Sequence, residues 1–275
     1  MPTALFSTDA PGRVRTERAW WRPVHDVGHL LRFRAAAVRR RTAFRWSVLV
    51  LVLITLAAGT VPAFVPADPD RQLEIAVLLP TGMAAILVIS VVSAIASGGG
   101  RELISREQGV AFPVSPTTDH LGALLLAPLN IAWLIQAWVL LGSTAYVSLP
   151  ERLPTAQTVM LLWLAMATAG AQVIAWVVET IRRRPRGVVT MRLVLVMLAG
   201  TVLAIQLAGR TTTLLDQIPT LRLVVAGVAG FTWAWVTVVI LELAVLVLLV
   251  VAGAVPAHLA ARRLPHDELR AETDT

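Results

Sequence analysis

The sequence contains no cysteine and no lysine, and each absence excludes a class of chemistry. Without cysteine among its 275 residues, the chain has no disulfide, thiolate metal site or cysteine nucleophile. All 24 basic residues are arginine. A P-loop needs a lysine at the nucleotide phosphates, and a Schiff base needs an amine. We therefore expect no nucleotide-binding or catalytic site in this chain, and no cofactor of its own.

Charged residues are also scarce. They make up 15% of the chain, against about a quarter in soluble domains, while 56% of residues are hydrophobic and the mean hydropathy is +0.72. A bilayer accepts the apolar surface that water would not. The sequence therefore predicts an all-α integral membrane protein. Its pI near 11.4 comes from arginines that flank apolar runs, so we expect membrane lipid headgroups, and not nucleic acid, as the counter-charge.

Six apolar runs are long enough to cross a membrane core of about 30 Å. They are Phe44–Phe64, Leu73–Ala96, Leu121–Val147, Thr158–Ile181, Met191–Ala208 and Leu223–Gly253. With both ends of the chain in the cytoplasm, twenty arginines lie in the cytoplasmic segments and four lie outside: Arg71, Arg152, Arg210 and Arg222. Because basic residues favour the cytoplasmic side, this distribution predicts six spans with both ends inside.

The predicted organisation has three parts. Residues 1–43 form a basic cytoplasmic leader, 44–256 the six-span membrane domain, and 257–275 a cytoplasmic tail. Within the leader, Pro23–Arg45 has an apolar stripe at helical spacing and predicts an amphipathic helix on the membrane surface; a solvated basic leader is the alternative. The segment Leu214–Gly230 precedes the last span, and the alternatives there are a short re-entrant helix or a lengthened span.

The cytoplasmic loop over residues 97–120 has the composition of a docking contact. It begins with a flexible Ser97–Gly100 and ends in turns at Pro113 and Pro116, after which Thr117 or Thr118 is expected to cap the next helix. Ion-pairing side chains and rigid prolines let such a loop seat in a cleft of another protein. The loop's charged residues before its first turn, and that turn itself, are Arg101, Glu102, Arg106, Glu107, Pro113, Val114 and Ser115.

These charged residues, followed by Pro113, Val114 and Ser115 before the third span, resemble the loop of the permease subunits of type-2 ATP-binding-cassette (ABC) exporters. The resemblance implies that the loop is a coupling helix bound to a separate ATPase subunit, which carries ATP and magnesium. It also implies a second permease domain, from a copy of this chain or a similar one, and export of a substrate that it does not identify. The apolar spans favour a hydrophobic or lipid-like substrate, and the use of arginine without lysine favours a bacterial cytoplasmic membrane. The alternative is a membrane scaffold or sensor without transport activity.

Polar residues inside the predicted spans are candidates for a translocation pathway. Glu242 lies deep in the sixth run, where a carboxyl group must face protein or water because its insertion costs about 2.5–3.5 kcal/mol. It could line a pathway, pair across a subunit interface, or be protonated and hydrogen-bonded. The other candidates, for which interhelical hydrogen bonding is the alternative, are Asn130, Gln136 and Gln172. His25 and His29 have metal-ligand spacing but no third ligand, so no metal site is expected.

Overall fold

The structure is a computed structural model that describes residues 27–29, 41–66, 68–96, 116–182, 184–209 and 217–261. Within those ranges every regular element is helical, as expected where no water is available to satisfy backbone groups. The elements are α2 (Arg41–Thr60), η2 (Val61–Phe64), α3 (Pro69–Ala96), α5 (Pro116–Leu126), η4 (Ala127–Leu129), α6 (Ile131–Val147), η5 (Pro150–Arg152), α7 (Leu153–Arg182), α8 (Gly187–Leu207), α10 (Thr220–Val228) and α11 (Trp233–Ala261).

The helices fall where the apolar runs predicted them, and they define an all-α, multi-pass membrane protein. Four helical segments are long and apolar enough to cross a bilayer: Thr42–Phe64, Pro69–Ala96, Pro150–Arg182 and Trp233–Ala257. A fifth results if the bent pair α5 and α6 counts as one span. The helix α8 covers the fifth predicted run with 21 residues. The count of six spans and the sidedness of the chain stay predictions.

Two of the predicted runs are broken in the structure. The third run bends by 58° between α5 and α6, where Pro128 lies in a short 3-10 turn and Asn130 caps α6. The sixth run divides into α10 and α11 at Gly230, whose φ of 89° favours glycine. With nine residues, α10 is about 14 Å long and too short to cross a membrane core.

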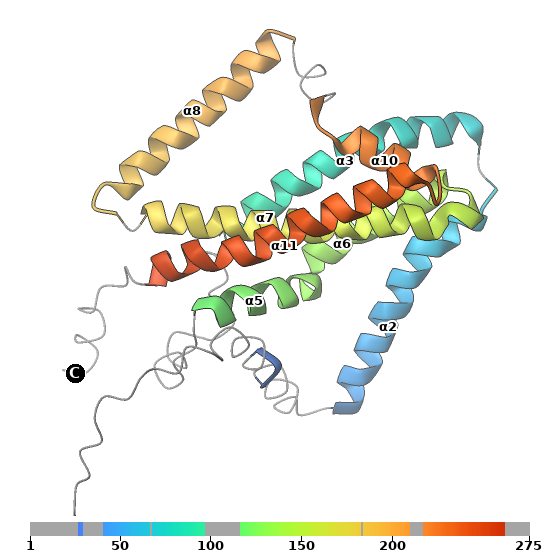
Figure 1. Cartoon of the computed structure of the whole chain (residues 1–275), viewed down its shortest axis with the longest axis horizontal. Coiled ribbons are helices and arrows are strands. Elements are labelled where there is room, and N and C mark those ends of the chain that lie inside the picture. The colour runs from blue at the N-terminus through green and yellow to red at the C-terminus, as the bar shows by residue number, and fades with distance from the viewer. Residues whose placement is uncertain are drawn as a thin grey trace, which may run out of the picture.

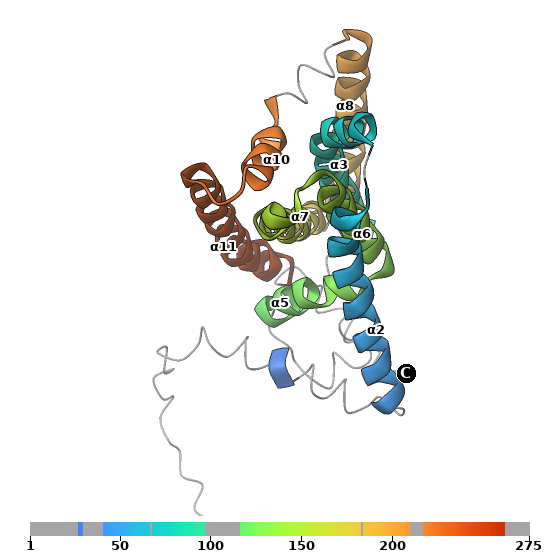
Figure 2. The same ribbon diagram turned by 90° about the vertical axis from the view of Figure 1, so that its right-hand side faces the viewer.

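Helix α7 is at the centre of the arrangement. It contacts α3, α6, α10, α11, α5 and α8, and Figure 2 shows it surrounded by most of these neighbours. In Figure 1, α3, α7 and α11 run in the same direction, from their first residues on the right to their last residues on the left. The segments that precede these three helices therefore lie at one end of the protein, and the segments that follow them lie at the opposite end.

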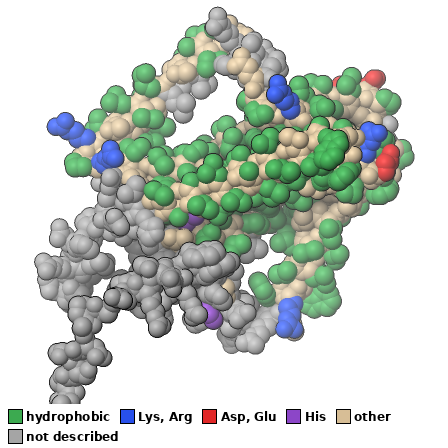
Figure 3. All heavy atoms as spheres, viewed as in Figure 1, with side chains coloured by type: hydrophobic (Ala, Val, Ile, Leu, Met, Phe, Trp, Pro, Cys, Tyr) green, Lys and Arg blue, Asp and Glu red, His purple; other side chains and the backbone are tan. Residues whose placement is uncertain are grey.

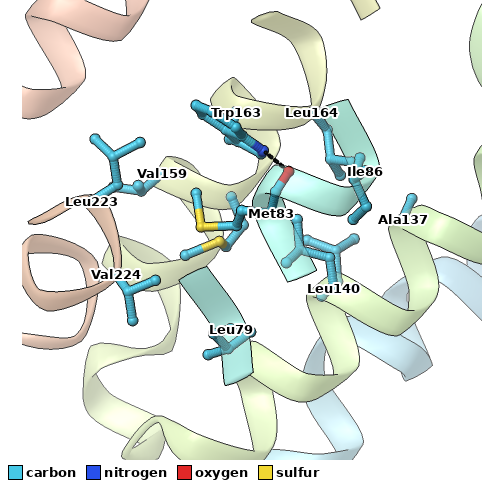
Figure 4. Packing of buried hydrophobic residues seen from close by; sticks show 12 residues of the cluster. Leu79, Met83, Ile86, Ala137, Leu140, Val159, Trp163, Leu164, Leu223 and Val224 are labelled. Carbon is cyan, nitrogen blue, oxygen red and sulfur yellow. Dashed lines mark hydrogen bonds between the residues drawn. The ribbon is translucent and has the colours of Figure 1, made fainter. Parts of the chain in front are cut away.

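The packed core lies where α3, α6, α7 and α10 meet (Figure 4). Trp163 of α7 is buried there, and its indole Nε1 donates a hydrogen bond to the Met83 carbonyl oxygen of α3 at 3.1 Å. Met83 and Val159 are completely buried beside it. This hydrogen bond satisfies the polar atom of the indole ring, as required of a tryptophan inside a core.

The helices α2 and α8 lie outside this core. In Figure 1 both diverge from the central group, and most of their side chains are exposed hydrophobic residues. Figure 3 shows hydrophobic side chains spread along the helices, while the charged groups lie at helix ends and turns. Such a distribution is expected for helices that contact lipid along most of their length.

Candidate functional site

The seven predicted coupling residues, Arg101 to Ser115, lie outside the described residues. The structure does describe the helices on both sides of them, α3 and α5. The last residues of α3, α7 and α11 and the first residues of α5 and α8 lie on the same side of the molecule in Figure 1. The predicted docking loop is thus attached to the end of the protein at which both α7 and α11 terminate.

The end of the predicted loop is helical from Pro116 onward. Proline suits the first turn of a helix, since its missing N–H has no partner there. Thr117 and Thr118 therefore lie inside the first turn of α5, and the prediction that one of them caps the helix from outside is wrong. Thr118 is 1% exposed and so belongs to the protein interior. The loop end is anchored in the bundle and does not lie free at the surface.

His120 is a polar residue of α5 that reaches into the protein interior. Its side chain is completely buried, and its Nε2 lies 3.2 Å from the Val250 carbonyl oxygen in α11. Since a carbonyl only accepts, this bond requires the proton on Nε2, which leaves Nδ1 as an acceptor. Nδ1 is buried and has no hydrogen-bond partner in the part of the chain that the structure describes.

Gly253 of α11 makes room for this histidine. A Cβ atom at Gly253 would overlap the His120 ring at Cε1 and Nε2, and it would also come within 3.1 Å of Val173 in α7. Only glycine lets the three helices α5, α7 and α11 approach this closely. Small residues at helix contacts have this role in many membrane proteins.

The neighbouring turns of α7 and α11 are joined by further contacts. The Thr180 hydroxyl donates to the Trp176 carbonyl oxygen at 2.8 Å and lies 3.4 Å from the Pro256 carbonyl oxygen. Glu179 is buried and pairs with Arg182, whose side chain is 56% exposed, at 3.2 Å. This end of α7 therefore holds the Thr180 hydroxyl against α11, while Arg182 remains accessible.

Glu242 lies on α11, far from the helix ends. It is 3% exposed, and neither carboxyl oxygen has a hydrogen-bond partner within the described ranges. Glu242 and Gly253 are about three turns apart and share one face of α11, roughly 16 Å apart along its axis. Hydrogen bonding between helices, one explanation the sequence leaves open, thus has no partner for this side chain among the described residues.

The other polar candidates have separate environments. Asn130 is exposed and its Oδ1 accepts a hydrogen bond from the Ala132 N–H at 2.9 Å, so its role is to cap α6. Gln136 is half-buried on α6. Gln172 is buried on α7, and its Nε2 lacks a hydrogen-bond partner in the described part of the chain. Gly170, two residues before Gln172, lies against Leu249, which is about 10 Å along α11 from Glu242.

His120 and Gly253 were not among the residues singled out from the sequence. A histidine at the very end of the predicted loop and a glycine three residues before Pro256 are visible in the sequence, but neither belongs to a recognisable motif. Their contact joins segments about 130 residues apart, as does the bond from His120 to Val250. Among His, Asp and Glu residues of the described ranges, no group of three could hold a metal ion.

No protein-family model matches the sequence, and no curated protein or solved structure is significantly similar to it. The class of the protein therefore rests on its own helices: it is an all-α membrane protein with several membrane-spanning segments.

Proposed function

We propose that this chain is the permease subunit of an ATP-driven exporter of the type-2 ABC class, located in a bacterial cytoplasmic membrane. In this proposal it has six spans with both ends in the cytoplasm, and α10 is a re-entrant helix before the last span. A separate ATPase subunit binds ATP and magnesium and docks on the loop that contains Glu102 and Glu107. Two permease chains together enclose the path of a hydrophobic or lipid-like substrate.

The observation that carries the proposal is the attachment of the loop. The loop joins α3 to α5, and α5 packs on α11 through the buried His120 and also contacts α7. A force applied to the loop by a bound protein would therefore act directly on the two helices that pack most extensively on each other. A freely suspended loop could bind a partner but could not move the bundle.

The charges at the two ends support the proposed sidedness. The turn between α7 and α8 carries Arg182, Arg184 and Arg186, with Arg192 one turn into α8, at the end where the loop is attached. At the opposite end, the described arginines Arg71, Arg152 and Arg222 are matched by acidic residues: Asp68, Asp70, Glu74 and Glu151. An excess of arginine at the loop end agrees with a cytoplasmic location there.

Glu242 is the pathway group in this proposal. Its two oxygens have no donor from the described helices, so they can accept a hydrogen bond from a substrate or from a second copy of the chain. Buried polar groups without a protein partner are costly and are typically found at functional positions in membrane proteins.

The decisive experiment is ATP hydrolysis by the chain reconstituted in lipid with its co-purified ATPase. We compare the intact chain with a Glu107→Ala/Pro113→Ala loop variant and with a Glu74→Ala/Pro150→Ala variant at the opposite end. The loop variant should lose assembly or at least tenfold in turnover, whereas the opposite-end variant should keep both. If a correctly folded intact chain captures no ATPase, the exporter proposal is wrong and the scaffold or sensor alternative gains support.

A further inference from the structure

We propose that His120 and Gly253 form a joint that passes a movement of the 97–115 loop to α11 and so to the face that bears Glu242. This inference rests on the proposed function, and it assigns positioning roles to His120 and Gly253. The His120 ring is fixed in place, α11 can bend where the ring inserts, and the part of α11 that would move carries Glu242.

The ring is held by shape and by a hydrogen bond. His120 has no exposed surface, its Nε2 bonds to the Val250 carbonyl oxygen, and the absent side chain of Gly253 leaves the space that the ring fills. Pro116 starts α5 only about one turn earlier, directly after the loop. A displacement of the loop end therefore cannot occur without displacing the ring, because one helical turn is too short to absorb it.

The contacted part of α11 is suited to bending. Pro256 has no N–H and cannot donate to the carbonyl of Ala252, and Gly253 weakens the same turn. Helix bends are found mostly at proline and glycine positions. The Val250 carbonyl already accepts from its own helix, so the histidine adds a bond without breaking the helical one. The ring thus presses on the turn of α11 that resists bending least.

The turn of α11 that can bend, at Gly253, and Glu242 lie on the same face of the helix. Beyond the joint, α11 continues without glycine or proline from Trp233 to Ala252, so this part moves as one rigid rod. A small rotation at Gly253 is carried over roughly 16 Å to Glu242. The joint therefore gives the loop a mechanical route to a buried carboxyl group in the middle of the protein.

The contact itself is tested by a double-mutant cycle on the unfolding temperature in detergent. Gly253→Ala should lower it by roughly 3–10 °C, because the added methyl group overlaps the ring. Gly82→Ala is the matched control, since a Cβ there meets no atom within 4 Å. In a His120→Ala background the loss caused by Gly253→Ala should fall to less than half. Equal losses in both backgrounds would show that the two residues do not act together.

The coupling role is tested by distances in the assembled complex. Because the chain has no cysteine, spin labels can be placed at Val77→Cys on α3 and Ile240→Cys on α11, two exposed positions. Trapping ATP on the co-purified ATPase should shift the intact distance by about 2 Å or more. His120→Ala should keep ATPase binding but lose the shift. His120→Gln, which retains a donor for the Val250 carbonyl, should restore part of it.

The outcomes separate the joint from the proposed function. If the ATPase binds and His120→Ala shows the same shift as the intact chain, the joint is not the route to α11. If the ATPase binds and the intact chain shows no shift, α11 is not the moving helix and the joint is again wrong. If no ATPase binds the intact chain, the exporter proposal itself fails, while the stability cycle still decides whether the two residues are in contact.

Discussion

The inner helix α7 and the outer helices α2 and α8 are made from similarly apolar sequences, yet they contact different surroundings. In an apolar 18-residue stretch of the span that contains α7, 44% of residues are buried inside the protein, against 6% in such a stretch of the α2 span. In α8, described side chains such as Val196 and Met197 are more than two-thirds exposed. Hydropathy therefore identifies membrane helices but does not distinguish a helix that faces protein from one that faces lipid.

Small and hydrogen-bonding residues make that distinction. The buried residues of α7 include Ala156, Ala167, Ala169, Ala171 and Ala175, which let neighbouring helices approach. Gln157 of α7 donates from Nε2 to the carbonyl oxygens of Gly59 and Leu141, on α2 and α6. In lipid, apolar side chains gain little from leaving one apolar medium for another, so close packing and hydrogen bonds determine which helices associate.

The largest loss in the free energy of unfolding should come from a substitution in the packed core around α7. We expect Trp163→Ala to reduce the free energy of unfolding by about 3 kcal/mol, the lower end of the range for soluble cores, because lipid also accepts the exposed surface. Trp163→Phe is the control: it keeps a ring and loses the bond to the Met83 carbonyl oxygen, at a cost of about 0.6 kcal/mol. Unfolding in mixed detergent micelles measures both. A loss below about 1 kcal/mol for the alanine variant would contradict the central position of α7.

A substitution of Glu242 should instead raise the free energy of unfolding. Although Glu242 lies on the inner face of α11, it makes no hydrogen bond within the described ranges. We therefore expect Glu242→Leu to stabilise the chain by about 1–3 kcal/mol, since an unsatisfied buried polar group is removed. Under the exporter proposal, the same substitution should impair ATP hydrolysis by the assembled complex. Unfolding in mixed detergent micelles shows whether the free energy of unfolding rises or falls. A loss of stability would show instead that the carboxyl group has a structural partner, for example in a second copy.

The smallest effects should come from one substitution made on an inner and an outer helix. Val159 on α7 is completely buried, whereas Val196 on α8 is 68% exposed. Val159→Ala leaves a gap in the core and should cost about 1 kcal/mol through lost contacts. Val196→Ala should change the free energy of unfolding by less than about 0.5 kcal/mol. Equal costs would mean that α8 is packed against another protein surface, as in an assembly of two chains.

Much of the fold could be predicted from the sequence, because a bilayer imposes simple rules on it. Runs of about 20 apolar residues must be helical, so the positions of α2, α3, α7, α8 and α11 follow from hydropathy alone. The separate short helix before the last span was one of two alternatives, and Gly230 marks where it ends. The bend in the third run was not predicted, although Pro128 and Asn130 are local signals for it.

The candidate site, too, could be predicted from the sequence only in part. The sequence by itself determined the membrane class, the arginine distribution and the 97–120 loop as a docking candidate, because these depend on composition and order along the chain. The tertiary structure alone decided that α7 is central, that Asn130 is a helix cap, that Glu242 lacks a partner among the described residues, and that His120 fills the space at Gly253. These facts depend on contacts between residues far apart in the chain, and no local pattern specifies which helix faces which.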